Sequence, residues 1–240
     1  MEEIAANLVR IKNEIKQACL SVGRDPSTVR LLAVSKSFPV EAIKTAYDTG
    51  HYLFAENRVQ ELCSKIPLLP GLIEWHLIGT LQRNKVKDVI GKVALIHSVD
   101  SLRLAEEINK QALKRNLSVN ILLQVNIAGE ETKHGFSSQA VLEKIEELSR
   151  MPGLNIRGLM TIAPFTDNPE EVRPVFRQLK VLAKHIEELG LPGVQMKELS
   201  MGMSGDFHVA IEEGATLVRI GSRIFGTRNY VRGNVENEGI

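Results

Sequence analysis

Eight short apolar segments alternate with helix-forming segments along the chain, and this alternation constrains the fold more than any other feature. A first helix is predicted over 2–22, where apolar residues recur every three or four positions. Strands are then expected at 31–35, 51–54, 75–79, 93–98, 119–126, 156–160, 197–200 and 217–220. Helices are expected at 40–47, 57–65, 81–90, 101–115, 138–150, 169–189 and 207–213. Such alternation favours parallel strands joined by right-handed crossovers, so the sequence predicts an α/β fold.

The number of strand–helix units indicates how the sheet is arranged. Eight units in about 210 residues fit a closed (β/α)8 barrel, or TIM barrel. An open doubly wound sheet is the alternative, which the count of eight disfavours. The chain has 240 residues, and α/β barrels commonly reach this length as one unit. We therefore expect one domain over 1–228 with an extra N-terminal helix, and a flexible tail over 229–240.

Charge and composition exclude several classes of partner. Acidic and basic residues nearly balance, with 29 Asp and Glu, 30 Lys and Arg, and a net charge of +1. Nothing in this balance indicates a nucleic-acid or membrane partner. The first residues contain no apolar signal-peptide core, and no apolar run approaches the ~20 residues that span a bilayer. The two cysteines, Cys19 and Cys63, lack metal-ligand spacing, so we expect a cytoplasmic protein without a metal site.

Lys36 is the first candidate for chemistry, because it lies where a buried strand ends. Residues 31–39 (LLAVSKSFP) form an apolar run that meets a lysine and then a proline. In a barrel, the functional residues lie at the C-terminal ends of the strands. Partial burial lowers the pKa of an amine, and a neutral amine attacks an aldehyde. Lys36 is therefore either a Schiff-base lysine or an ordinary surface amine.

Two segments near the end of the chain are typical of an anion site. Residues 200–206 (SMGMSGD) precede the short helix expected at 207–213, and residues 219–222 (RIGS) end the last strand. Their glycines let the backbone approach a ligand, while N–H groups and hydroxyls favour phosphate. Either segment alone can be a turn with a helix cap. Many barrels bind phosphate after their last two strands, so together the segments predict a phosphate site.

Lys36 and this phosphate site would be neighbours, because the first and last strands of a closed barrel pair. An amine and a phosphate cradle separated by roughly one small ring are typical of a pyridoxal 5′-phosphate site. Arg219 could then face the pyridine nitrogen. An arginine accepts no proton, so it would keep that nitrogen unprotonated and weaken the ring as an electron sink. The alternative for Arg219 is a salt bridge inside the barrel.

Several motifs resemble the YggS/PROSC family of pyridoxal phosphate homeostasis proteins over about residues 5–228. They are AVSK (33–36), FAENRVQE (54–61), WHLIGTLQRNK (75–85), QVN (124–126), RGLM (157–160), LSMGMS (199–204) and VRIG (218–221). The resemblance implies a barrel of the alanine-racemase N-terminal type, with pyridoxal 5′-phosphate on the lysine that matches Lys36. It implies phosphate contacts from Ser204, Gly221 and Ser222, and a pyridine contact from Arg219.

The same resemblance implies that Asn57, His76 and Met203 line the pocket. From the residues alone, two of these keep an alternative. His76 lies beside Trp75 in a strand, where a histidine is often a satisfied core residue. Asn57 precedes a helix and could cap it.

The expected activity depends on whether a second base is present. Racemisation on this cofactor needs bases on both faces of the substrate carbon. In alanine racemases the second base is a tyrosine from another domain and subunit, and this chain has no room for that domain. We therefore expect a monomeric protein that holds and delivers pyridoxal 5′-phosphate, with apo-enzymes as possible recipients. A weak racemase is one alternative, and a Schiff-base aldolase acting on a phosphosugar is another.

Overall fold

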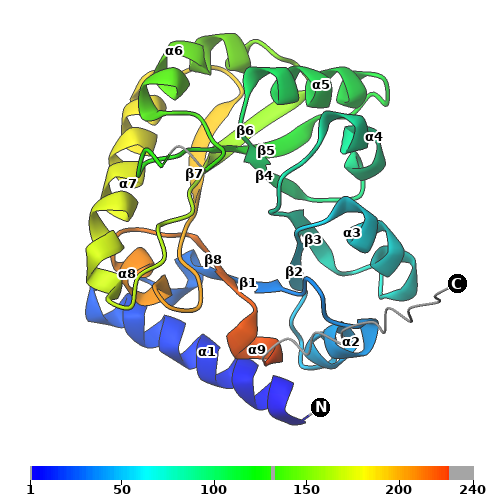
Figure 1. Cartoon of the computed structure of the whole chain (residues 1–240), viewed down its shortest axis with the longest axis vertical. Coiled ribbons are helices and arrows are strands. Elements are labelled where there is room, and N and C mark those ends of the chain that lie inside the picture. Colours follow the sequence, from blue (N-terminus) through cyan, green and yellow to red (C-terminus); the bar gives the residue numbers. More distant parts are fainter. Residues whose placement is uncertain (1, 131–132, 227–240) are drawn as a thin grey trace, which may run out of the picture.

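In the computed structural model, which describes residues 2–130 and 133–226, eight parallel strands form a closed barrel in chain order (Figure 1). This confirms the predicted (β/α)8 architecture. The tail expected over 229–240 lies outside the described residues. The strands are β1 (Arg30–Val34), β2 (Leu53–Glu56), β3 (Glu74–Leu77), β4 (Leu95–Val99), β5 (Val119–Gln124), β6 (Leu154–Met160), β7 (Val194–Ser200) and β8 (Leu217–Ile220).

Helices surround the barrel, and α1 lies before the first strand as expected (Figure 1). Its buried residues, among them Leu8, Ile11 and Ile15, form one face that packs beside α8, α9 and α2. The α-helices are α1 (Glu2–Ser21), α2 (Val40–Asp48), α3 (Val59–Lys65), α4 (Val86–Val89), α5 (Leu102–Leu113), α6 (Ser138–Ser149), α7 (Arg173–Glu188), α8 (Phe207–Glu212) and α9 (Ser222–Phe225). The 3₁₀ turns are η1 (Pro26–Thr28), η2 (Ile66–Leu68), η3 (Arg83–Lys85) and η4 (Pro169–Val172).

Most predicted segments differ from the observed ones by up to three residues at an end, and in three of them the cause is visible in the backbone. Strand β2 begins at Leu53 rather than at 51, and the ring of His51 bonds back to the Leu53 carbonyl instead. The helix predicted over 81–90 is split, because Gln82 is extended and η3 precedes the short helix α4. The helix predicted over 169–189 begins as η4, and each of its two parts has a proline in its first turn.

A bulge in β6 explains why this strand contains a glycine. The register of β6 shifts against both neighbours, between Ile121 and Leu122 of β5 and between Ile156 and Gly158 of β6. Gly158 has a φ of 151°, and a Cβ atom there would lie 1.8 Å from the Glu198 carbonyl oxygen. Only glycine permits this approach of β6 to β7, so the Arg157-Gly158 pair of the motif serves strand pairing.

The two ends of the chain meet in the barrel wall. Strand β1 pairs with β8 at four register positions, including Leu32 with Arg219 and Ala33 with Ile220. The pairing of β7 with β8 is shorter, with Ser200 opposite Leu217 as its register pair. The loops that follow β1, β7 and β8 therefore emerge side by side at the C-terminal end of the barrel.

The interior of the barrel is a mixture of apolar and polar layers. Two small apolar clusters contain residues of the strands and of the loop after β3 but none of the helices, which places them inside the barrel. They are formed by Leu32, Val34 and Ala55, and by Leu95, Leu122, Met160 and Leu217. His76, His97, Ser200 and Arg219 are also buried on strands.

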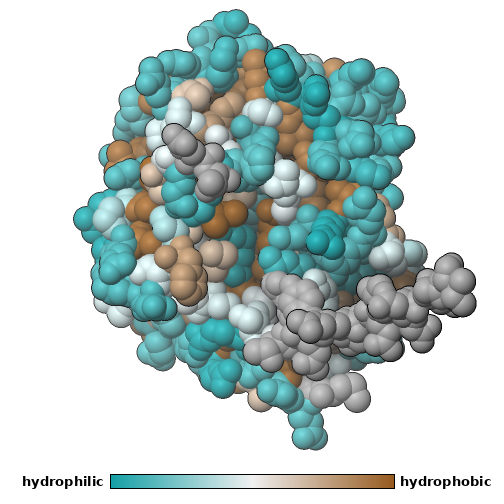
Figure 2. Space-filling model, in the orientation of Figure 1, coloured by the Kyte–Doolittle hydropathy of each residue, from teal (hydrophilic) through white to brown (hydrophobic). Residues whose placement is uncertain are grey.

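The surface shows where hydrophobic side chains are gathered. Hydrophobic residues lie toward the middle of the face in Figure 2, within a rim of hydrophilic residues over the outer helices. Among the described residues, no helix combines the length and the apolar character needed to span a membrane.

Candidate cofactor-binding site

Lys36 lies two residues after the end of β1 and is half-buried, in a turn whose backbone is held on both sides. Ser37 has a φ of 65°, a conformation that is uncommon for a residue other than glycine. The N–H of Ser37 donates to Glu61 Oε1 at 2.6 Å. The carbonyl of Ser35 accepts from Lys65 Nζ at 2.9 Å. The peptide groups that flank Lys36 are thus fixed by side chains from α3.

A buried ion cluster supplies these anchors. Lys65 is 5% exposed, and its Nζ lies 2.7 Å from Glu56 Oε1 and 2.6 Å from Glu61 Oε1. Ser35 Oγ also donates to Glu56 Oε1 at 2.7 Å. Burial raises the pKa of Glu56, while the bonds from Lys65 and Ser35 oppose that shift. The cluster holds the turn that carries Lys36, and we call it the Lys65 brace.

The two predicted anion-binding loops come together at the end of β7 and β8. Ser204 Oγ lies 3.2 Å from Ser222 Oγ, and the N–H of Arg219 donates to the carbonyl of Gly202 at 3.0 Å. A Cβ atom on Gly221 would lie 2.9 Å from the Val34 carbonyl oxygen, two residues before Lys36. The loop after β8 therefore lies against the end of β1, as the predicted site requires.

Gly202 shapes the loop after β7. Its φ is 88°, and a Cβ atom there would lie 2.5 Å from Ala210 Cβ and 3.0 Å from Phe207 Cα. The loop can fold back onto α8 only because this residue has no side chain. Asp206 Oδ1 accepts from the N–H of Met203 at 2.5 Å and closes the loop.

Arg219 projects into the barrel and is 5% exposed. Its Nη1 donates to Ser200 Oγ at 2.7 Å, and its Nη2 donates to the Thr161 carbonyl at 2.8 Å. Burial lowers the pKa of Arg219 to about 10, so the guanidinium remains charged at neutral pH. Its hydrogen-bond partners among the described residues are neutral oxygens, so the salt bridge considered from the sequence is not what holds it.

The remaining predicted pocket residues occupy different depths. Met203 is 37% exposed at the rim. Asn57 follows β2, and its Oδ1 is buried without a hydrogen-bond partner among the described residues. The predicted cap is not formed by this side chain, because α3 begins after Arg58 with no side-chain cap bond. His76 lies deeper, inside the barrel, bonded to His97 and Glu74.

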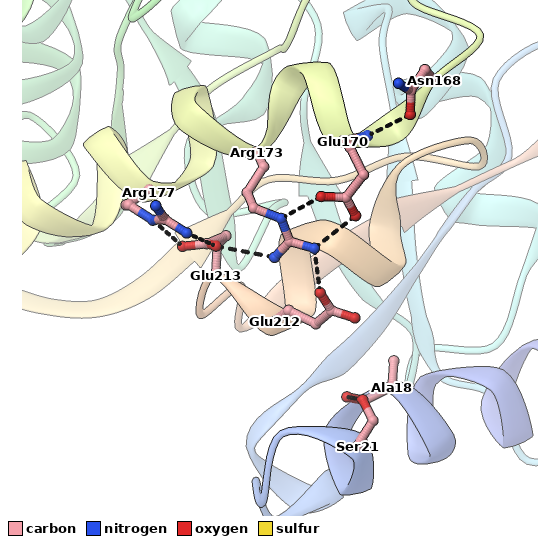
Figure 3. Close-up of polar contacts among 8 residues, drawn as sticks. All are labelled: Ala18, Ser21, Asn168, Glu170, Arg173, Arg177, Glu212 and Glu213. Atoms are coloured by element: carbon pink, nitrogen blue, oxygen red, sulfur yellow. Dashed lines mark hydrogen bonds and ion pairs between the residues drawn. The ribbon is translucent and has the colours of Figure 1, made fainter.

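An ion network fixes the far end of α8, which follows the loop after β7 (Figure 3). Arg173 at the start of α7 contacts Glu170 at 2.6 Å, Glu212 at 2.5 Å and Glu213 at 3.1 Å. Arg177 adds a bond of 2.8 Å to Glu213. The carboxylates raise the pKa of Arg173. These contacts of Arg173 and Arg177 with Glu170, Glu212 and Glu213, which we call the Arg173 network, attach the C-terminal end of α8 to α7. They thereby stabilise the helix onto which the loop after β7 folds.

These residues fit pyridoxal 5′-phosphate. A Cβ atom on Gly202 or Gly221 would collide with Ala210 or with the Val34 carbonyl, so these glycines let the two loops pack closely and bring Ser204 and Ser222 together. Asn57 has a buried oxygen without a hydrogen-bond partner among the described residues. It borders a cavity of about 260 Å³ whose other lining residues lie at the end of β5 and in the loops after β3, β5 and β6, and not in the Lys36 turn or the loops after β7 and β8. Arg219 supplies a charged hydrogen-bond donor inside the barrel. The donor set therefore suits an anionic group beside a polar ring.

Some residues of the site escaped the sequence analysis. Lys65 and Glu61 hold the Lys36 turn, yet on α3 they read as ordinary helix residues. Thr161 and His97 contribute through contacts between distant strands. One signal was available for His97, which lies two residues after Leu95 in a strand that is otherwise apolar at its start. A polar residue on the inward face of a buried strand requires a partner.

Comparisons with known proteins agree with this geometry. The family model for the alanine racemase N-terminal domain matches residues 2–229. A pyridoxal phosphate homeostasis protein of Aquifex aeolicus is 47% identical over 93% of this chain and 97% of its own. One from Haemophilus influenzae is 40% identical over 95% of this chain and 97% of its own. The structure of PipY from Synechococcus elongatus with PLP bound is 37% identical, with a TM-score of 0.80 over 93% of this chain and 100% of PipY.

Proposed function

This chain belongs to the alanine racemase N-terminal domain family, and from that premise we propose that it binds pyridoxal 5′-phosphate as a Schiff base on Lys36. Its role is cofactor homeostasis, in which it buffers or delivers pyridoxal 5′-phosphate without robust catalytic turnover. The proposal rests on one observation above all. The end of β1, which carries Lys36, lies against the loop after β8, which contacts the loop after β7.

Each group of residues has a part in holding the cofactor. When bound, pyridoxal 5′-phosphate supplies an aldehyde for an amine and a ring that withdraws electrons. Ser204, Gly221 and Ser222 would hold its phosphate through hydroxyls and backbone N–H groups. Arg219 would donate to the pyridine nitrogen. Since the pKa of Arg219 stays near 10, it gives up no proton to that nitrogen at neutral pH.

The surroundings of the site favour storage over turnover. Tyr47 lies near the end of α2 and Tyr52 just before β2, which places both near the N-terminal end of the barrel, away from Lys36. They pack edge to face with ring centroids 5.2 Å apart. Tyr230 lies outside the described residues. No described tyrosine is thus positioned as a second base opposite Lys36, which favours binding over racemisation.

The decisive experiment follows the covalent link. Purified protein loaded with pyridoxal 5′-phosphate should be yellow, and borohydride should fix a pyridoxyl group on Lys36 that peptide mass spectrometry locates. Lys36→Ala should abolish the adduct, while Lys44→Ala, at an exposed position of α2, should leave it intact. A pyridoxyl group on a different lysine would contradict the assignment. A colourless protein that traps only a phosphosugar would favour the aldolase alternative.

Delivery and turnover need separate measurements. Holo-protein incubated with an apo-enzyme should restore its activity, and more holo-protein should restore more. Alanine and serine should not racemise at enzyme-like rates. Enzyme-like racemisation by the wild type that Lys36→Ala abolishes would establish the racemase alternative, which the family relationship keeps open. We also propose that the protein lies in the cytoplasm, since both cysteines are free thiols, and that it acts as a monomer.

A further inference from the structure

A continuous hydrogen-bonded path crosses the inside of the barrel from Arg219 to Glu74. Arg219 Nη1 lies 2.7 Å from Ser200 Oγ, which lies 2.9 Å from His97 Nδ1. His97 Nε2 lies 2.8 Å from His76 Nδ1, and His76 Nε2 lies 2.9 Å from Glu74 Oε1. The path starts beside the loops that follow β7 and β8, and it ends at the N-terminal end of the barrel. We call it the histidine relay.

The Glu74 carboxylate fixes the direction of the bonds in the relay, and Arg219 is compatible with that direction. A guanidinium only donates, so Ser200 Oγ accepts from Arg219, and its own hydrogen remains free to point toward His97 Nδ1. His97 then carries its hydrogen on Nε2 and donates to His76 Nδ1. His76 likewise carries its hydrogen on Nε2 and donates to the Glu74 carboxylate, which only accepts. All four bonds therefore point from Arg219 to Glu74.

The reverse direction is unfavourable for a neutral pair of histidines. If His97 carried its hydrogen on Nδ1, then His76 would have to donate from Nδ1 as well. The bare Nε2 of a neutral His76 would then face the carboxylate of Glu74, so two acceptors would oppose each other inside the protein. Both rings are buried, at 1% exposure for His76 and 0% for His97. Burial also lowers the pKa of each histidine, which keeps both rings neutral.

The charges at the two ends of the relay indicate that it helps to compensate the buried charge of Arg219. Arg219 is a buried cation bonded to neutral oxygens, and a buried charge of this kind needs compensation, of which Asp206 supplies a part. Aligned dipoles of the relay lead from it to the anion Glu74, whose side chain is 44% exposed. Arg30 lies 3.3 Å from Glu74 and 2.8 Å from Glu198, so both glutamates share one cation at this end.

We propose that His76 and His97 are positioning residues that act on Arg219 through Ser200, and that Glu74 sets their direction from the opposite end of the barrel. The relay holds the guanidinium plane against Ser200 and the Thr161 carbonyl. It thereby orients the group that would meet the pyridine nitrogen. This inference deepens the proposed function, since it concerns the same site, but its first test does not depend on the cofactor.

That first test reads the tautomers of the two rings directly. In ¹⁵N NMR spectra of the cofactor-free protein, His76 and His97 should both be neutral and carry hydrogen on Nε2. Neither ring should become doubly protonated at a pH near the ordinary histidine pKa of about 6.5. Hydrogen on Nδ1 of either ring would overturn the proposal. So would double protonation of either ring near neutral pH.

The second test separates the relay from charge acting through space. Glu74→Gln removes the strict acceptor, because an amide can both donate and accept, so the tautomers should become mixed. Its dissociation constant for pyridoxal 5′-phosphate should rise about threefold to tenfold, as expected when a buried network loses its alignment. The matched control is Glu198→Gln, which removes a carboxylate that contacts the same Arg30 but is not bonded to either histidine.

The outcomes distinguish three cases. Tautomer mixing and weaker binding in Glu74→Gln, with neither change in Glu198→Gln, support the relay. Equal weakening in both variants would mean that the negative charge acts through space, and the relay would be refuted. Unchanged tautomers in Glu74→Gln would refute it as well. Should the wild type fail to bind pyridoxal 5′-phosphate, the proposed function fails while the tautomer test still decides the relay.

Discussion

At the scale of single residues, two lysines show how position decides the role of one side chain. Lys36 is half-buried in the turn after β1, and the end of that strand lies against the loop after β8. Lys65 is 5% exposed and bonded to two carboxylates and a carbonyl. The second lysine therefore cannot act on a ligand, and it instead fixes the backbone that presents the first.

Lys65→Met should strongly destabilise the protein. Breaking a buried ion pair by removing one partner costs about 3–5 kcal/mol, because the remaining charge is left uncompensated. Here Glu56 would keep its buried carboxylate and lose its cation. Urea denaturation should show this loss, while Lys110→Met, at an exposed pair with Glu107, should cost less than about 1 kcal/mol. Similar midpoints for both variants would contradict the brace.

His51 should make the stability fall as the solution becomes acidic. Burial, with a contribution from Lys12, lowers the pKa of His51 to about 4. The unfolded state binds a proton near pH 6.5 and the folded state does not, so stability is lost as pH falls from about 6.5 to about 4. The loss attributable to His51 should reach about 3 kcal/mol. Urea midpoints measured across this range should depend less on pH in His51→Gln, and parallel profiles would exclude His51 as the cause.

The residues of the candidate site could be predicted from the sequence only where they lie near the C-terminal end of a predicted strand. Lys36, Ser204 and Arg219 each stand at or just beyond the end of a strand, so their proximity follows from barrel topology. His97 and Lys65 could not be assigned that way. Lys65 bonds to Ser35 across 30 positions, and His97 to Ser200 across 103. Neither contact has a local signal, because each depends on how side chains interdigitate in three dimensions.

At the scale of elements, the loop after β7 is held from two sides. Gly202 lets it fold onto α8, and the Arg173 network ties the other end of α8 to α7. The sequence predicted the loop and the short helix with nearly correct bounds. Other predicted bounds were wrong where the backbone conformation overrides the periodicity of apolar residues. Leu81 was predicted to begin a helix because it is apolar, but the extended conformation of Gln82 separates it from that helix.

Gly202→Ala should damage this loop while Gly205→Ala should not. The new Cβ at Gly202 would meet Ala210 at 2.5 Å in a backbone conformation unfavourable to alanine. We expect a loss of about 1–3 kcal/mol and weaker retention of pyridoxal 5′-phosphate. Gly205 has nothing within 4 Å of its Cβ position. Thermal denaturation and equilibrium dialysis measure both effects, and equal behaviour of the two variants would rule out steric control by Gly202.

Arg173→Met should loosen the attachment of α8 to α7. Three glutamates would lose a shared cation, so we expect a loss of about 1–2 kcal/mol, more than an isolated surface pair provides. Lys184→Met is a matched control in the same helix, because its pair with Glu188 is highly exposed. Urea midpoints should separate the two variants. A larger loss in Lys184→Met would show that the network does not support α8.

At the scale of the whole molecule, the candidate site joins the first strand of the barrel to the last two. The closed order of strands was predictable, because eight alternating units leave few arrangements for parallel strands. The bulge in β6 was not, since nothing local reveals that Gly158 lies against Glu198.

Pyridoxal 5′-phosphate should stabilise the entire fold. A ligand that binds only the folded state adds about 2.7 kcal/mol at a concentration 100 times its dissociation constant. The midpoint of thermal unfolding should rise with cofactor concentration in the wild type and much less in Lys36→Ala. If both proteins respond equally, then the stabilising ligand is held elsewhere.

The short pairing of β7 with β8 has a consequence for how an empty molecule differs from a loaded one. Ser204 and Ser222 follow the two strands of that pairing, so a phosphate held by both, as we propose, would join β7 to β8 where they share one register pair. Amide hydrogen exchange in the cofactor-free protein should then be fastest along this pairing. If the protein delivers its cofactor as proposed, an apo-enzyme could distinguish the loaded form from the empty form by the rigidity of this part of the barrel.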